Sequence, residues 1–482
     1  MLKAKKIPVY EPGEDDYERH IATANLIYRF STPRCVVQPK CACDNGGHSY
    51  AGGSTTNMGI LMELGLMNEV IIDMKSETVT VKGGALWFHV YRALVSRHLD
   101  SYVANGGRCP TVRVSGFMLG GGLSPFTRSF GMGRDTVERF TIVTAVGDEV
   151  TVSKDDDPKS PKSRLFWALR GAGGGNFGVV VEMKLALKKL RSDYVVAGRY
   201  TWFPERQSMD AFITVMNGFY TRDWPNEMTI DSTWLCDLAN TRTDVAVRFL
   251  VYYNGERGAF DRAIDDWALP NAPSQHAELK KQLKRRSLQE KSSRFLHETL
   301  AAQLPLFTPE ERQTRRSGET RRFAGAVVFY HAYIMIQWDE KWLEMNMRGF
   351  LERMKPRLSP LGMVQGATFI NFPDDSLSQD AHEISYFGNN HQELRRIKQT
   401  WDGDNFFKWS QGIRLPVARN ATRAANTADQ EGDDAVRSLF AAENFAVNEE
   451  KLTDVLAGDQ GESYWPRIQH DSFGGVALPT GI

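Results

Sequence analysis

A single cysteine lies within a glycine-rich segment of this chain. The stretch at 106–122, GGRCPTVRVSGFMLGGG, places Cys109 directly before a proline, and four of the seven residues from Gly116 to Gly122 are glycine. Glycine has no Cβ, so a cluster of glycines lets the backbone approach a flat or charged ligand. The segment is therefore a candidate binding loop. A flexible surface loop is the alternative.

Three other segments favour the binding loop. The stretch at 45–53, NGGHSYAGG, places His48 behind two glycines and ahead of a serine, and the stretch at 171–178, GAGGGNFG, has five glycines in eight residues. Near the carboxy terminus stand YFGNN at 386–390 and DGDNF at 402–406. Taken singly, His48 could be a turn residue and Cys109 a buried packing residue. The joint occurrence of all four segments makes ligand binding the stronger interpretation.

Together, these segments resemble those of the berberine-bridge-enzyme-like flavoprotein oxidoreductases, and of the fungal members above all. The resemblance runs from about residue 31 to about residue 416. The resemblance implies an FAD-binding domain of the PCMH type, as in the vanillyl-alcohol-oxidase superfamily, and bonds from His48 and Cys109 to the flavin. We expect the other cofactor-binding residues to be Gly46, Gly47, Ser49, Gly52, Gly116, Gly120, Gly121, Gly175, Asn176, Val179, Tyr386, Asn389 and Asn405.

The same resemblance implies the reaction. A hydride would move from an alcohol, sugar or secondary-metabolite carbon to flavin N5, while the protein orients the substrate and removes a proton. Val112 occupies the position that gates oxygen in related plant enzymes, where valine is typical of oxidases and leucine of dehydrogenases. We therefore expect O2 as electron acceptor and H2O2 as product. A dehydrogenase and an inactive, degenerate flavoprotein are the alternatives.

This chain departs from the family at the residues that would accept the proton. Phe369-Ile-Asn-Phe372 stands where the family often has Tyr-x-Asn-Tyr, and Phe117 stands where plant members have a histidine. Tyr386 is expected to pack beside the flavin instead. The predicted strand at 329–338 places His331 and Tyr333 on one face. These two residues are the candidate catalytic groups.

The expected fold is α+β, with a two-lobed FAD-binding domain and an inserted substrate domain whose antiparallel sheet is covered by helices. The FAD-binding domain would comprise 1–190 and 376–416, the substrate domain 191–375, and a variable tail 417–482. Only a few residues separate the first strand, CVVQPK, from Gly46. A helix and a strand of the family are therefore absent there, which leaves it open whether FAD still binds.

Periodicity predicts the elements around these segments. Strands are expected within 70–81, 140–152, 179–187, 195–203, 228–236, 245–253, 329–338 and 367–375. Helices are expected at 85–98, 205–219, 260–269, 280–303 and 392–401. The motif G-x-G-x-x-G at 173–178 is followed by a strand rather than a helix, so it does not indicate a dinucleotide fold.

Composition excludes several functional classes. The 59 basic residues balance the 59 acidic residues, which gives no argument for nucleic acid or an anionic membrane surface. Five cysteines without zinc spacing indicate neither a disulfide framework nor a metal site. No apolar stretch is long enough to span a bilayer. The amino terminus lacks an apolar signal region, so a cytoplasmic location is expected, with secretion left open.

Overall fold

The computed structural model describes most of the chain up to residue 416. The described residues are 7–22, 28, 30–39, 49, 52–204, 206–235, 246–291, 295, 317–322, 328–333, 344–358, 368–374, 376–378 and 380–416. Gly46, Gly47 and His48, the segment missing a helix and a strand, and the predicted tail therefore lie outside the described residues. The chain forms two compact units, Met1–Leu351 with Met363–Val417, and Glu352–Gly362 with Ala418–Ile482. The domain boundaries within the first unit stay a prediction.

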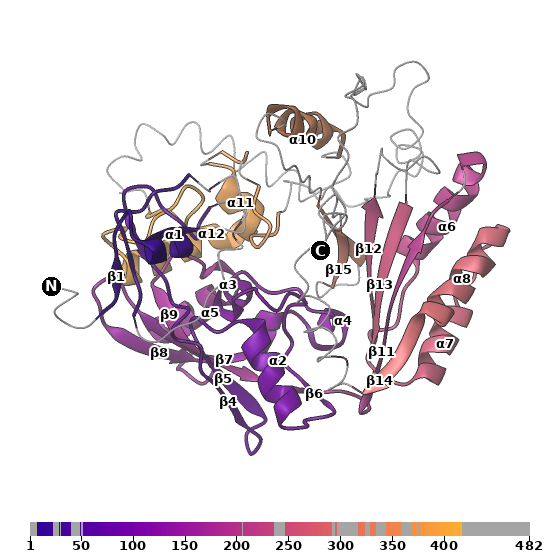
Figure 1. Cartoon of the computed structure of the whole chain (residues 1–482), viewed down its shortest axis with the longest axis horizontal. Coiled ribbons are helices and arrows are strands. Elements are labelled where there is room, and N and C mark those ends of the chain that lie inside the picture. The colour runs from indigo at the N-terminus through magenta and orange to yellow at the C-terminus, as the bar shows by residue number, and fades with distance from the viewer. Residues whose placement is uncertain are drawn as a thin grey trace, which may run out of the picture. The chain divides into compact units, whose positions relative to one another are not determined.

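The first part of the chain builds two sheets. A three-stranded sheet contains β1 (Val9–Tyr10), β2 (Cys35–Val37) and β3 (Ile60–Met62), and β2 and β3 are parallel. An antiparallel five-stranded sheet has the order β4-β5-β9-β7-β8 (Figure 1). Its strands are β4 (Val70–Asp73), β5 (Thr78–Lys82), β7 (Val137–Val143), β8 (Glu149–Ser153) and β9 (Val179–Ala186).

Helices and short elements surround these sheets. They are α1 (Asp15–Ile21), α2 (Trp87–Ser96), α3 (Val114–Leu119), α4 (Thr127–Phe130), α5 (Pro161–Ala172), the 3-10 turn Gly133–Thr136, and the pair β6 (Tyr102–Val103) and β10 (Lys188–Lys189). The hairpins predicted within 70–81 and 140–152 are confirmed by the pairs Val70↔Val81 and Phe140↔Val152. The helix predicted at 85–98 is α2.

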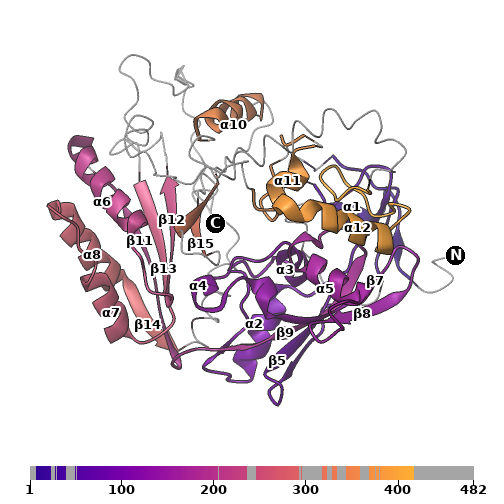
Figure 2. The ribbon, with the colours of Figure 1, turned by 180° about the vertical axis from the view of Figure 1, so that it is seen from behind.

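An antiparallel six-stranded sheet of order β14-β11-β13-β12-β15-β16 follows. Its strands are β11 (Tyr194–Trp202), β12 (Met228–Leu235), β13 (Ala246–Tyr253), β14 (Ser287–Lys291), β15 (Ser317–Arg322) and β16 (Val328–Tyr333). Three helices, α6 (Met209–Thr221), α7 (Arg257–Asp265) and α8 (Ser274–Arg286), cover one face, and the 3-10 turn Arg206–Ser208 precedes them (Figure 2). This sheet confirms the antiparallel, helix-covered arrangement expected from the sequence.

Two predicted elements are wrong. The helix expected to run from 280 to 303 ends at Arg286, because 287–291 form β14 and pair with β11 at the edge of the sheet. The strand expected at 367–375 is absent from 368–374. There Phe372 N donates to Phe369 O at 2.8 Å and Thr368 N to Ser385 O at 2.9 Å, so these amides make a turn and a loop contact instead of a ladder.

The chain then returns to the first sheets. After α10 (Glu344–Leu358) come α11 (His382–Phe387), the 3-10 turn Gly388–Asn390 and α12 (His391–Trp401), which packs against α5. Leu394, Ile397 and Ile413 belong to the same buried core as the five-stranded sheet and α2. A separate core lies between the six-stranded sheet and its helices. Residues before 190 and after 380 thus build one hydrophobic core together.

Candidate active site

The Cys109 loop is tied to the first turn of α2. Val112 N donates to Cys109 O at 3.3 Å, and the amides of Trp87 and Phe88 donate to Val112 O at 3.1 Å and Pro110 O at 2.9 Å. The first amides of a helix have no partner within that helix, so the loop carbonyls satisfy two of them. The half-buried Cys109 has its sulfur 3.2 Å from Thr111 Oγ1. The helix therefore holds the thiol on a fixed backbone.

Tyr91 fixes the loop from inside the core. Its hydroxyl donates to Gly107 O at 2.5 Å. Burial, with smaller contributions from Cys109 and Tyr252, raises the pKa of Tyr91 far above its ordinary value. The phenol stays protonated at neutral pH. Tyr91 therefore orients the backbone beside Cys109 and does not act as a base.

The predicted glycines of the organising segment have different surroundings. A Cβ on Gly120 would lie 1.6 Å from Asn371 Oδ1, and one on Gly121, whose φ is +117°, would lie 2.7 Å from Met132 Cε. Gly116 on α3 has no atom within 4 Å of the equivalent position. Gly120 and Gly121 thus permit close packing within the protein, whereas Gly116 leaves open space on α3.

The loop after α5 is also closely anchored. Gly175 is exposed with φ +71°, and a Cβ there would lie 3.4 Å from Trp409. Asn176 is fully buried. Its Nδ2 donates to Ala172 O at 2.8 Å and its Oδ1 accepts from Ile413 N at 2.9 Å. Val179 is half-buried at the start of β9. The Asn176 side chain therefore shapes this loop, and Gly175 forms its exposed edge.

The remaining predicted cofactor residues lie on separate loops. Ser49 Oγ accepts from Gly53 N at 3.1 Å, and Gly52 has φ +71° against the Tyr28 ring. Asn389 is exposed, and Asn405 is half-buried with φ +54°. These contacts are all within the protein, and the cofactor roles of the four residues stay predictions.

The carboxy-terminal tyrosine is held by its own hydrogen bonds. Tyr386 OH donates to Gln411 Oε1 at 2.7 Å and accepts from Asp374 N at 3.2 Å. Phe369, at the position of the family tyrosine, is buried 3.3 Å from the point where a Gly121 Cβ would be. The segment carrying Phe369 is thus packed against the glycine-rich stretch. Asn371 Nδ2 strengthens this packing by donating to Phe117 O at 3.0 Å.

The candidate catalytic residues are placed by strand register. His331 pairs with Glu319 and Tyr333 with Ser317, and β15 meets β12 at Ser232↔Gly318. Directly paired residues share a face, and neighbours alternate. His331 and Tyr333 therefore occupy register positions on the same face as Asp231, opposite the helices. Val112 is half-buried against the first core.

Sequence reasoning missed an ion pair at this site. Arg108, the residue before Cys109, pairs with Asp231 on β12. The Asp231 side chain is 3% exposed and that of Arg108 27%. An aspartate in the strand MTIDSTWL gives no signal for a partner so distant in sequence. Only the fold brings the two together.

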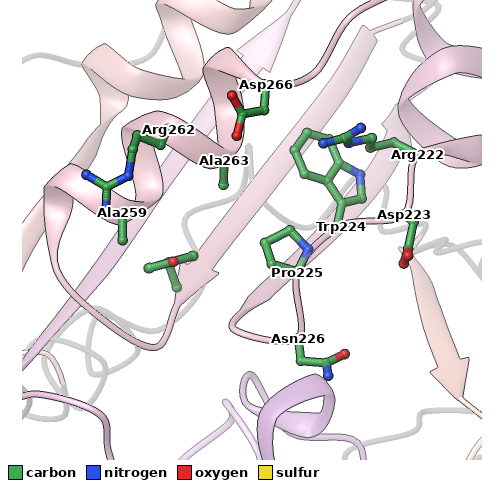
Figure 3. A pocket seen from close by; sticks show the side chains of 10 residues that line it. Arg222, Asp223, Trp224, Pro225, Asn226, Ala259, Arg262, Ala263 and Asp266 are labelled. Atoms are coloured by element: carbon green, nitrogen blue, oxygen red, sulfur yellow. The ribbon is translucent and has the colours of Figure 1, made fainter.

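A cavity of about 480 Å³ lies elsewhere, between α7 and the loop after α6 (Figure 3). Arg222 and Trp224 line one side, and Arg262 of α7 and Asp266, the residue after α7, line the other. None of the predicted site residues lines this cavity. Within the described residues, no group of acidic, histidine and cysteine side chains could hold a metal, and no helix is long and apolar enough to cross a membrane.

Comparison with known proteins identifies the family. Residues 40–153 match the family model described as "FAD binding domain", and residues 368–414 match "Berberine and berberine like". In these two segments the chain carries the FAD-binding and berberine-like domains of the berberine bridge enzyme-like FAD-linked oxidoreductases. It is an oxidoreductase that uses FAD. The two matched segments include Cys109 and Tyr386, and they lie on either side of the six-stranded sheet in the sequence.

Three similar proteins define the extent of the likeness. The FAD-linked oxidoreductase ZEB1 of Gibberella zeae is 27% identical, over 77% of this chain and 71% of the relative. The (R)-6-hydroxynicotine oxidase of Paenarthrobacter nicotinovorans is 33% identical, over 41% of this chain and 43% of the relative. Berberine bridge enzyme of Eschscholzia californica superposes with a TM-score of 0.72 at 18% identity, over 86% of this chain and 97% of that structure. The last match shows the PCMH-type fold.

The described residues of this berberine bridge enzyme-like chain fit FAD. Trp87 Nε1 and Trp409 Nε1 are buried and have no hydrogen-bond partner in the described part of the chain. The Trp87 nitrogen lies 3.2 Å from the point where a Gly107 Cβ would be, and the Trp409 nitrogen lies 3.4 Å from the corresponding point at Gly175. Buried donors usually have an acceptor, so two at glycine loops are consistent with a polar ring system bound there.

Proposed function

We propose that this chain is an FAD-linked oxidase with the flavin bound covalently through His48 and Cys109. The substrate would be a small molecule with an oxidisable alcohol, sugar or secondary-metabolite carbon, and oxygen would accept the electrons and become H2O2. The observation that carries the proposal is the Cys109 loop, whose carbonyls bind the first amides of α2. The partners of the protein would then be this substrate and oxygen. A cytoplasmic location stays a prediction.

The protein and the cofactor would divide the work. Bound FAD would supply the hydride acceptor and pass both electrons on to oxygen. The chain's own residues would fix the ring and the substrate. Tyr91 and α2 hold the backbone around Cys109, while Asn176 holds the loop that carries Gly175. Such rigid positioning lowers a barrier because reacting atoms must meet at about 3–3.5 Å with aligned orbitals.

We propose His331 or Tyr333 as the proton acceptor. Register supports both, because they stand on the face of the six-stranded sheet that carries Asp231. Two other aromatic positions are less suitable. Phe369 has no ionisable group, and the raised pKa of Tyr91 keeps its phenol protonated. A His331→Ala variant and a Tyr333→Phe variant should separate the two, because loss of the acceptor lowers turnover by about 100-fold or more.

The covalent links can be counted directly. The wild-type protein is precipitated with acid, and flavin absorbance and intact mass are measured in the pellet. We expect one FAD per chain in wild type, retained FAD in His48→Ala and in Cys109→Ala, and none in the double variant. Wild type that releases all its flavin into the supernatant contradicts the covalent proposal. Wild type purified without any flavin favours the degenerate alternative.

Val112 distinguishes an oxidase from a dehydrogenase. The likeness to a protein named an oxidase supports oxygen as acceptor, as does valine at this position. Substrate-reduced enzyme is mixed with oxygen and flavin reoxidation is followed. Val112→Leu should slow this step about tenfold, a barrier increase of about 1.4 kcal/mol, whereas Val112→Ala should not slow it. Equal rates in all three proteins would remove the gating role, and slow wild-type reoxidation would favour a dehydrogenase.

A further inference from the structure

The Arg108–Asp231 ion pair connects the Cys109 loop to the six-stranded sheet. Ile230 and Trp234, which lie one and three positions from Asp231 along β12, pack toward the helix-covered core. Because side chains alternate along a strand, Asp231 points from the opposite face. There its carboxylate meets the Arg108 guanidinium, which also lies 6.0 Å from the centre of the Tyr252 ring.

Asp231 is an unusual side chain for this place. It is buried, and its Oδ1 has no hydrogen-bond partner among the described residues. Removing a carboxylate from water is costly, and one ion pair rarely recovers the whole cost. A hydrophobic pair of similar volume would serve stability at least as well. The pair is therefore better explained by what it orients than by what it stabilises.

Arg108 is bonded directly to Cys109, so an anchor on its side chain restricts the thiol. Tyr91 anchors the loop at Gly107 O, and α2 anchors it at Pro110 O and Val112 O. These three contacts hold the backbone on the side of the first core. Asp231 supplies an anchor from the opposite side, through the side chain adjacent to the cysteine. Together they leave the loop little freedom to rotate.

We propose that Asp231 is a positioning residue for attachment of the flavin to Cys109. This inference rests on the proposed function. In the attachment, the Cys109 sulfur forms a bond to flavin C6, and the hydrogens of the thiol and of C6 leave as two protons and two electrons. Oxygen accepts both electrons and both protons and becomes H2O2. The bond needs the sulfur within about 3–3.5 Å of its target, and a misplacement of about 1 Å costs roughly 100-fold in rate.

The test isolates the Cys109 link in a His48→Ala background. Flavin retained after acid precipitation is measured per chain, and the mass of the Cys109 peptide is determined. Asp231→Asn should reduce the linked fraction at least fivefold, and Asp231→Glu should restore most of it. Glu227→Gln is the matched control, because Glu227 precedes β12, is 14% exposed and pairs with Arg191 away from the cysteine. Glu227→Gln should keep the fraction of Cys109-linked flavin that the His48→Ala parent shows.

A second variant separates positioning from folding. Arg108→Leu combined with Asp231→Leu removes both charges and leaves no unpaired carboxylate, so the chain should fold. With His48 intact it should retain flavin through that residue. With His48→Ala it should show the same loss of the Cys109 link as Asp231→Asn. If Asp231→Asn or the double leucine variant links as much flavin to Cys109 as the His48→Ala parent does, Asp231 has no positioning role. The Cys109 bond itself is not affected by that result. A parent His48→Ala protein without linked flavin overturns the Cys109 bond itself, and with it this inference.

Discussion

Gly116 and Gly120 belong to the same glycine-rich segment, yet they have different surroundings. Gly120 faces Asn371, whose amide nitrogen donates to Phe117 O at 3.0 Å, while Gly116 faces open space on α3. We expect Gly120→Ala to lower the free energy of unfolding by about 1–3 kcal/mol, because the methyl group displaces Asn371. Gly116→Ala should raise it by up to about 1 kcal/mol, since alanine favours a helix.

Guanidinium denaturation measures both effects in a His48→Ala, Cys109→Ala background, which is expected to hold no covalent flavin. The control is Asn371→Ala, which vacates the space beside Gly120. In that background Gly120→Ala should cost much less than it does alone. If Gly120→Ala is harmless in the presence of Asn371, the close packing of the two segments is not what requires glycine at this position.

Residue types and local spacing identified Cys109 and the glycine loops, because a nucleophile among glycines is visible within a few positions. The same reasoning did not find Asp231, Asn371 or Trp87. Each acts through a partner that is adjacent only in the folded chain, and each is an ordinary residue of a strand, loop or helix when considered by itself. At this scale the sequence reveals which residues are unusual, and the fold reveals which contacts they make.

Secondary-structure elements were predictable where their hydrophobic period was strong and packing agreed with it. The strands β11, β12 and β13 alternate between a helix-covered face and an opposite face, and the sequence predicts all three. The prediction is wrong for residues 287–291, because the basic run at 280–286 suggests a helix that continues through them. The open edge of β11 instead binds 287–291 as β14, which satisfies backbone groups that a helix would have used internally.

The contact between α11 and α12 depends on a buried carboxylate. Glu383 Oε2 accepts from Arg395 Nε at 2.8 Å, and its Oε1 accepts from Arg414 N at 2.7 Å. Burial alone would raise the pKa of Glu383, but the bonds from Arg395 and Arg414 outweigh it and the net pKa is lowered. Its stabilising contribution is therefore present above the unfolded-state pKa and is lost as the pH falls through the folded-state pKa.

Glu383→Gln should reduce the free energy of unfolding by about 3 kcal/mol at pH 7, since it leaves buried guanidinium charge uncompensated. The difference in free energy of unfolding between this variant and wild type should stay constant down to about pH 4.5. Below that pH the difference should become smaller. Urea denaturation between pH 3.5 and pH 8 provides the measurement. Glu393→Gln is the control, because its side chain is 33% exposed and its loss should cost less than about 1 kcal/mol. If the difference in free energy of unfolding does not change with pH, folding does not shift the pKa of Glu383.

For the whole molecule, the main consequence of the fold is that the chain leaves the first core and later returns to it. The return depends on Lys398, which is fully buried and donates to Asn176 O at 2.7 Å, Asp402 Oδ2 at 2.5 Å and Phe407 O at 2.5 Å. Asn176 in turn accepts from Ile413 N. The loop that carries Gly175 is thus completed only when the returning segment is in place.

A double-mutant cycle tests this dependence. Lys398→Met removes the cation and leaves Asp402 buried, and Asn176→Ala removes the acceptor for Ile413 N. Residues that share one network couple by about 0.5–3 kcal/mol, so the double variant should be more stable than the sum of the single losses predicts. Asn176→Ala with Glu393→Gln should be additive within about 0.5 kcal/mol. Additivity in both cycles would mean that the loop carrying Gly175 and the returning segment are stabilised independently of each other. Coupling in the first cycle alone would mean that the Gly175 loop and the returning segment stabilise each other, so any ligand held at the loop depends on both segments.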